Sequence, residues 1–271
     1  MVRSRRAGSM RSRRPSASMT ETEEARAPSG GPADALVIAG LVPMSTVDWP
    51  DHLSATVFTQ GCPWNCFYCH NQALIPVRTP GAVAWGEVRD LLGRRRGLLD
   101  GVVFTGGEAL RQDALADAAR EVIDMGFAVG LHTAGPYPRR LHDMVERGLV
   151  DWVGLDIKAL PEHYAQVVGR PNSAAKAWQC LHVLLEAAAD GGPDFEVRTT
   201  VVPGDVTADD AVEVARRVHE AGARVYALQQ ARGEGTTGRF AVVAPGWDAA
   251  CERMAERIEA LGWDRFTYRP A

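Results

Sequence analysis

The stretch GVVFTGGEALRQDALADAAREVIDMGFAVGLHT, residues 101–133, decides the fold class. It contains two short β-rich runs, at 101–106 and 127–133. The segment between them carries apolar residues at the spacing of one helical face: Leu110, Ala114, Ala118 and Val122. A strand, a helix and a second strand in this order are typical of two parallel strands joined by a crossover helix.

The same alternation continues on both sides of this stretch. Further β-rich runs cover residues 54–60, 151–158, 195–202 and 224–230. Helical stretches are expected at 161–190 and 246–262, and another from Thr207, where Asp210 completes a capping box. About six strand–helix units are fewer than the eight of a closed barrel. We therefore expect an α/β fold, a partial (β/α)6 TIM-like barrel that forms a single domain.

The composition is that of a globular protein, with 46% hydrophobic and 24% charged residues in 271. A net charge of -4 gives no general attraction to nucleic acid, and no apolar run is long enough to span a membrane. Residues 1–34 are rich in Arg, Ser, Pro and Gly and poor in large apolar side chains. We expect this segment to be a disordered basic tail ahead of a domain at 35–271.

Three of the five cysteines lie close together in the sequence: Cys62, Cys66 and Cys69. Gly61 and Pro63 disfavour a helix here, so a loop wrapped around a metal is favoured over three buried core thiols. Structural zinc needs four protein ligands, and His70 follows Cys69 too closely to serve as the fourth. Three thiolates on a four-iron cluster would instead leave one iron open to a substrate.

The other two cysteines fall in helical stretches, where we expect core positions: Cys180 and Cys251. An odd number of cysteines without a signal peptide favours a reducing compartment, so we expect a cytoplasmic protein.

The cysteine loop resembles a known motif. CPWNCFYC (62–69) has the CxxxCxxC spacing of radical S-adenosylmethionine (SAM) enzymes, and FTGGE (104–108) follows the next strand as in that family. A closer resemblance, to the activases of glycyl-radical enzymes, runs from residue 40 to about 235. It rests on STVDWP (45–50), LHTAG (131–135), LDIK (155–158), VVGRPNS (167–173) and VRTTVVPG (197–204), in that order. GLVPMSTVDWPD (40–51), together with CHNQALIP (69–76), looks most like the activating proteins of anaerobic ribonucleoside-triphosphate reductases.

The resemblance implies a radical SAM barrel with two cofactors, a [4Fe-4S] cluster with an open iron and SAM. The cluster would be held by Cys62, Cys66 and Cys69. The residues implied in binding the cofactors are Tyr68, Gly106, Gly107, Glu108, Thr133, Asp156, Lys158, Arg198 and Thr200.

Three of these residues have more specific implied roles. Glu108 would receive the methionyl amine of SAM, because a carboxylate suits a positive group. Lys158 would meet the SAM carboxylate and act in catalysis, and Asp156 matches a residue of a monovalent-cation site in pyruvate formate-lyase activases. Outside the cofactor site, Asp48 would help to hold the glycine loop of the partner.

The sequence departs from the family at two places. His132 stands where those activases have a cation-binding aspartate, and a neutral imidazole removes one hard oxygen ligand. The resemblance therefore leaves open whether a cation site exists here. Residues 228–230 also differ from the family pattern, so no adenine contacts are assigned to them.

The implied activity is reductive cleavage of SAM to a 5′-deoxyadenosyl radical, which generates a glycyl radical on a partner enzyme. The resemblance favours anaerobic ribonucleoside-triphosphate reductase as that partner, with flavodoxin or ferredoxin as electron donor. Two other readings stay open: a small-molecule radical SAM enzyme such as 7-carboxy-7-deazaguanine synthase, and a non-enzymatic zinc-binding module. Neither nucleic acid nor a membrane is an expected partner.

Overall fold

The computed structural model describes residues 30–233, 236 and 244–271. The chain divides into two units, 1–30 and 31–271, and the second of these carries the fold. Residues 31–34, which the composition assigns to the tail, belong to this second unit, because the 3₁₀ helix η1 (Pro32–Ala35) buries Ala33. The disorder expected for residues 1–29 lies outside the described residues.

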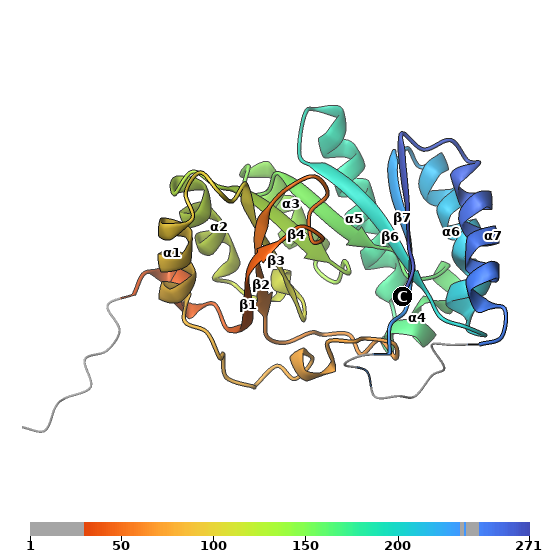
Figure 1. Ribbon diagram of the computed structural model, residues 1–271, viewed down its shortest axis with the longest axis horizontal. Coiled ribbons are helices and arrows are strands. Elements are labelled where there is room, and N and C mark those ends of the chain that lie inside the picture. Colours follow the sequence, from red (N-terminus) through yellow and green to blue (C-terminus); the bar gives the residue numbers. More distant parts are fainter. Residues whose placement is uncertain (1–29, 234–235, 237–243) are drawn as a thin grey trace, which may run out of the picture. The chain divides into compact units, whose positions relative to one another are not determined.

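One eight-stranded sheet, in the order β1 to β8, organises residues 31–271 (Figure 1). Its strands are β1 (Ile38–Ser45), β2 (Ser54–Thr59), β3 (Gly101–Gly106), β4 (Ala128–Thr133), β5 (Trp152–Asp156), β6 (Asp194–Val201), β7 (Val225–Gln230) and β8 (Arg265–Arg269). β1 runs antiparallel to β2, and each later neighbouring pair is parallel. The six predicted strands are confirmed as β2 to β7, and β1 and β8 extend the sheet at its two edges. No pairing joins β1 to β8 in the described part of the chain, so the barrel is partial.

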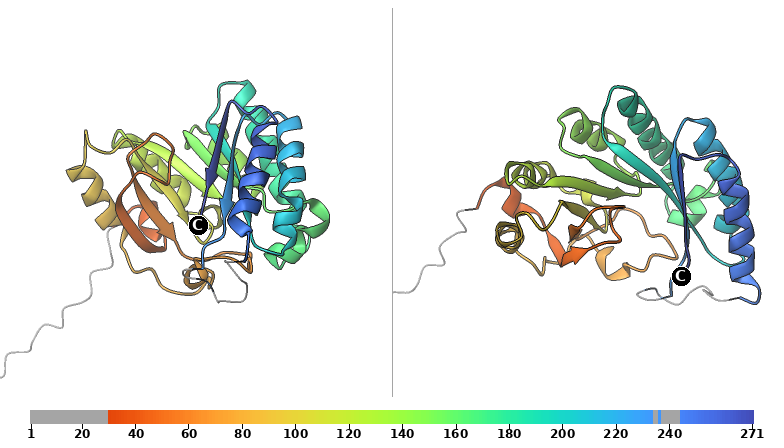
Figure 2. Two further views of the ribbon diagram at one scale, coloured as in Figure 1. Left: turned by 45° about the vertical axis from the view of Figure 1, so that its right-hand side comes forward. Right: turned by 45° about the horizontal axis from the view of Figure 1, so that its top comes forward.

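Helices cover the convex side of the curved sheet, as Figure 2 shows. They are α1 (Trp85–Arg94), α2 (Leu115–Asp124), α3 (Pro138–Glu146), α4 (Pro161–Val168), α5 (Ser173–Ala189), α6 (Val206–Glu220) and α7 (Trp247–Glu259). Two short 3₁₀ helices, η2 (Gln72–Leu74) and η3 (Ala109–Arg111), follow β2 and β3. The main core includes Leu131 and Leu155 from the strands and Leu115 and Leu184 from the helices. None of the described helices is both long and apolar enough to cross a bilayer.

Three helix boundaries differ from the prediction. Leu110 is buried as expected, but it lies in η3, and α2 begins only at Leu115. The stretch 161–190 is two helices, because Gly169 ends α4 with a left-handed φ of 67°. The capping box at Thr207 is wrong, since the Asp205 side chain caps α6 by accepting from the Thr207 N–H at 2.9 Å.

The inner face of the sheet carries a second, smaller core. Trp49, from the β1–β2 connection, stacks on Trp152 of β5 with 5.7 Å between ring centroids. Gly101 and Gly130 leave room for the indole, because a Cβ atom on either would lie 2.9 Å from a ring carbon of Trp49. Gly101 and Trp152 begin their strands, so this core fills the amino end of the barrel. The opposite, carboxyl end is where such folds build their sites.

Candidate active site

The cysteine loop leaves the carboxyl end of β2. The Cys62 N–H donates to the Ile75 carbonyl at 3.0 Å, and the Cys69 N–H donates to the Cys66 carbonyl at 3.1 Å. These bonds fold the loop without helix, as its glycine and proline predict. Cys66 is buried, and Cys62 and Cys69 are partly buried. Cys180 and Cys251 lie in the helical core, as predicted.

Burial keeps the three loop thiols protonated. It raises the pKa of Cys62 to about 12, with the charge of Glu108 adding to the effect, and the pKa of Cys66 to about 11. Burial also raises the pKa of Cys69. The positive charge of Lys158 opposes the shift at Cys66. Because thiolates are the metal-binding form, metal would enter this loop with release of protons.

The loop offers three thiols as candidate metal ligands. In the part of the chain that the structure describes, no three His, Cys, Asp or Glu side chains are grouped so that they could hold one metal ion. Zinc would need such convergence. A four-iron cluster binds each thiolate at a different iron atom, so its ligands need not converge on one point. The three thiols of the loop could supply three such ligands.

Glu108 lies just after β3, and its buried carboxyl group accepts three hydrogen bonds. Its carboxyl group accepts from the Thr133 hydroxyl at 2.9 Å, from the Ala134 N–H at 3.1 Å and from the Leu110 N–H at 3.2 Å. Burial raises its pKa to about 7 despite these donors. An ionised carboxylate has about four lone-pair positions, so one position is left for a positive ligand.

The glycine pair before Glu108 has a structural role of its own. Gly106 has a φ of +109°, and a Cβ atom there would lie 2.4 Å from the Thr59 nitrogen. A Cβ atom on Gly107 would lie 2.6 Å from the Gly61 carbonyl oxygen. The Glu108 N–H donates to that same Gly61 carbonyl at 3.0 Å. The pair therefore lets the start of the cysteine loop pack directly on the end of β3.

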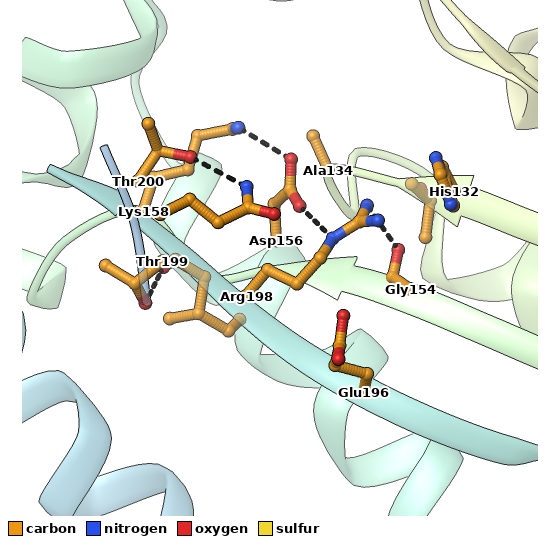
Figure 3. Close-up of polar contacts among 12 residues, drawn as sticks. His132, Ala134, Gly154, Asp156, Lys158, Glu196, Arg198, Thr199 and Thr200 are labelled. Atoms are coloured by element: carbon orange, nitrogen blue, oxygen red, sulfur yellow. Dashed lines mark hydrogen bonds and ion pairs between the residues drawn. The ribbon is translucent and has the colours of Figure 1, made fainter. Parts of the chain in front are cut away.

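Asp156, at the end of β5, joins two cations (Figure 3). Its carboxylate accepts from Lys158 Nζ at 3.0 Å and from Arg198 Nε at 2.9 Å. Burial alone would raise the pKa of Asp156, but the charges of Lys158 and Arg198 hold it below its ordinary value. Burial likewise opposes the charge of Lys158, and Asp156 more than offsets it, so the pKa of Lys158 lies above its usual value.

Two further predicted residues lie beside these three charged side chains: Tyr68 and Thr200. The Lys158 ammonium lies 5.5 Å from the ring centroid of Tyr68, whose hydroxyl is buried. Thr200 on β6 accepts from the side-chain amide of Gln229 at 3.2 Å. The structure thus brings the predicted cofactor residues of β3 to β6 and the cysteine loop to one end of the sheet.

His132 contacts Asp48 close to the ion pair of Asp156 and Arg198. His132 Nε2 lies 2.7 Å from the Asp48 carbonyl oxygen, and because a carbonyl only accepts, Nε2 carries the proton. Burial, together with the charge of Arg198, lowers the pKa of His132 to about 3, so the ring is neutral. The Asp48 carboxylate accepts from the Thr56 hydroxyl at 2.7 Å. Asp48 is therefore fixed on the inner face rather than free in a turn.

Sequence reasoning missed two residues that shape the site. Gly154 makes room for the guanidinium of Arg198, since a Cβ atom there would lie 2.6 Å from Arg198 Nη1. Its carbonyl accepts from Arg198 Nη2 at 3.1 Å. Tyr164 on α4 bonds the backbone on both sides of the Asp156–Lys158 turn. No signal in the sequence separates Tyr164 from an ordinary core aromatic on a helix.

Known proteins are similar to this chain in sequence. A protein of Methanocaldococcus jannaschii named as a glycyl-radical enzyme activating enzyme is 28% identical over 195 residues, which are 72% of this chain and 79% of that protein. The pyruvate formate-lyase-activating enzyme of Clostridium pasteurianum is 28% identical over 181 residues, 65% of this chain and 71% of that enzyme.

Solved structures share the fold. SuiB of Streptococcus suis bound to S-adenosylmethionine aligns with a TM-score of 0.57 at 9% identity, over 78% of this chain and 48% of that one. TYW1 with a lysine–pyruvate adduct aligns with a TM-score of 0.55 at 12% identity, over 76% and 73% of the two chains. The model of the Radical SAM superfamily matches residues 56–218, which hold the cysteine loop and strands β3 to β6. Since that match spans more than half of the chain, the protein is an enzyme of the radical SAM superfamily.

Proposed function

We propose that this enzyme is the activase of a glycyl-radical enzyme and removes the α-hydrogen of one glycine in a separate protein. The observation that carries the proposal is the meeting of the three-cysteine loop, Glu108 and Lys158 at one end of an open sheet. The similarity to two activating enzymes over most of the chain supports the same conclusion.

Each residue has a task in this proposal. Cys62, Cys66 and Cys69 hold the cluster and leave one iron open. When bound, the cluster and SAM supply the one-electron chemistry that makes a hydrogen-abstracting radical. Glu108 receives the amine of SAM and Lys158 its carboxylate. The remaining cofactor contacts fall to Tyr68, Gly106, Gly107, Thr133, Asp156, Arg198 and Thr200.

The partner that we propose is the anaerobic ribonucleoside-triphosphate reductase, because residues 40–51 and 69–76 resemble those of activating proteins of that enzyme. Asp48, held on the inner face by Thr56 and His132, would contact the glycine loop of the partner. The electron would come from a flavodoxin or a ferredoxin. A cluster with an open iron and a glycyl radical both require an oxygen-free cytoplasm.

Substitution of Cys66 tests the proposal. Cys66→Ala should abolish both iron incorporation and SAM cleavage, because the cluster would lose one of three ligands. Cys180→Ala is the matched control, since Cys180 is also buried but lies on α5 outside the loop, and it should retain four irons. Retention of four irons and full SAM cleavage by Cys66→Ala would contradict the proposal.

A second experiment identifies the substrate. Reduced enzyme and SAM should produce an electron paramagnetic resonance doublet on the anaerobic reductase. Turnover of a pterin without any partner protein would instead indicate a small-molecule enzyme. One zinc per chain without labile sulfide, after anaerobic purification, would indicate a zinc-binding module.

A further inference from the structure

The segment VVGRPNS (167–173) contains the end of helix α4. Gly169 takes a left-handed φ of 67°, and its N–H closes the last turn on the Ala165 carbonyl at 2.9 Å. The last carbonyls of a helix have no partner within the helix. Those of Val167 and Val168 therefore need donors from another segment.

The cysteine loop supplies these donors. The Asn65 N–H donates to the Val168 carbonyl at 3.0 Å, and the Phe67 N–H donates to the Val167 carbonyl at 3.4 Å. These two residues flank Cys66 on either side. Arg170, just past the helix, adds a third bond from its Nε to the Pro63 carbonyl at 3.0 Å.

The same helix also contacts the other half of the site. Tyr164 is fully buried, and its ring meets Trp64 of the cysteine loop edge-on, with 5.9 Å between centroids. Its hydroxyl donates to the Asp156 carbonyl at 3.3 Å and accepts from the Lys158 N–H at 3.4 Å. One side chain therefore touches the loop that carries Cys66 and the turn that carries Lys158.

We propose that the end of α4 is a template that fixes the Cys66 segment before any metal binds and holds it in register with Lys158. Tyr164 and Arg170 are its positioning residues. All of the bonds described above form within the protein itself, so the template exists in the metal-free chain. The consequence for the cofactors rests on the proposed function, whereas the order of the loop does not.

Hydrogen exchange on the metal-free full chain tests the first part. The amides of Asn65 and Phe67 should exchange slowly in the native chain. Arg170→Ala should speed both by about tenfold, which is the effect of losing roughly one net hydrogen bond. Arg120→Ala is the matched control, because Arg120 also donates to a backbone carbonyl, that of Arg147, at 3.3 Å. Exchange of Asn65 and Phe67 at unprotected rates in the native metal-free chain would overturn the proposal.

Two variants of Tyr164 test the second part on the loaded enzyme. Tyr164→Phe keeps the ring against Trp64 and loses the hydroxyl, so KM for SAM should rise several-fold while the rate of iron loss to a chelator stays unchanged. Tyr164→Leu also removes the ring contact and should speed iron loss. Tyr268→Phe, which loses a hydroxyl that accepts from the Gln230 side-chain amide at 2.6 Å and does not bond the Asp156–Lys158 turn, should change neither quantity.

The outcomes separate this inference from the proposed function. Equal effects of Tyr164→Phe and Tyr268→Phe on KM would contradict the link between Tyr164 and Lys158. Protected loop amides in a chain that binds iron but forms no glycyl radical on any partner would support the template and contradict the activase.

Discussion

At the scale of single residues, Asp156 shows how this chain balances charge inside a barrel. One carboxylate faces an ammonium and a guanidinium, each within 3.0 Å, so these three side chains together carry a net positive charge. His132 adds none, because burial and Arg198 keep it neutral. The excess positive charge lies next to Cys66 and opposes the cost of making its thiolate. It also suits the carboxylate that we propose Lys158 to bind.

The ion pairs of Asp156 predict independence from monovalent cations. The Lys158 ammonium and the Arg198 guanidinium each lie within 3.0 Å of its carboxylate, so their positive charges repel a further cation. The neutral ring of His132 supplies no anionic oxygen ligand. SAM cleavage should therefore proceed at the same rate when sodium and potassium are replaced by tetramethylammonium at constant ionic strength. A several-fold loss that either metal cation restores would show that a cation enters the site.

Glu108 predicts a dependence on pH. Its pKa is raised from the ordinary range to about 7, so the carboxyl is mostly protonated at pH 6 and ionised at pH 8. Only the ionised form attracts the ammonium group of SAM. The dissociation constant of SAM should therefore fall as pH rises through about 7, by up to about tenfold per pH unit below that value.

Titration calorimetry between pH 6 and pH 7.5 measures this dependence. The control variant, Glu108→Gln, should bind SAM about ten- to a hundredfold more weakly at pH 7.5, because it loses a hydrogen bond to a charged group. Its affinity should also be flat with pH. A native affinity that does not change over this range would contradict the role of Glu108.

At the scale of elements, the central strands of the sheet could be predicted from the sequence, and the two edge strands could not. The predicted strands are apolar runs that become central strands, and all six are confirmed. β1 and β8 escaped prediction because Pro43 interrupts one and Arg265 and Arg269 begin and end the other. Both lie at sheet edges, where proline and charge are tolerated.

The residues of the candidate active site could also be predicted only in part. Residues with distinctive chemistry in a motif, such as Cys66 and Glu108, could be named from the sequence, and the structure places them at one end of the sheet. Contacts made through the backbone could not be named. The α4 carbonyls that accept from the cysteine loop could belong to any residue type, so the sequence does not identify them. The sequence around Trp49 likewise does not show that its ring packs against Gly130.

The inner core makes a prediction about stability. Gly130→Ala should lower the free energy of unfolding by about 1–3 kcal/mol, because the new methyl group would lie 2.9 Å from the Trp49 ring and 3.0 Å from Val103. Urea unfolding measures the change. Gly93→Ala on α1 is the control, since nothing lies within 4 Å of its added Cβ atom, and it should be neutral or stabilising by up to about 1 kcal/mol.

A double variant tests the cause. Adding Trp49→Ala to Gly130→Ala should cost less than the sum of the two single changes, because the ring that obstructs the methyl group is gone. Additive effects would show that Gly130 is required for its backbone and not for the indole.

At the scale of the whole folded unit, an open sheet must expose two edges, and the chain joins them at one end only. The exposed Arg265 at the start of β8 pairs with Asp51 in the β1–β2 connection. Trp49 and Asp48 of that connection turn inward, so the amino end of the barrel is filled. The carboxyl end, with the cysteine loop, has no such bridge in the described residues.

The same architecture predicts the result of removing metal. The main core consists of strands and helices packed on one another, and the cysteine loop is held by backbone bonds to α4, so neither needs a metal to form. After chelation, the far-ultraviolet circular dichroism of the chain should be unchanged and thermal unfolding should remain cooperative. A domain whose fold depends on zinc would instead unfold when its metal is removed. Loss of the helical signal on chelation would show that metal organises this fold, and the cysteine loop would then be structural and not a site for chemistry.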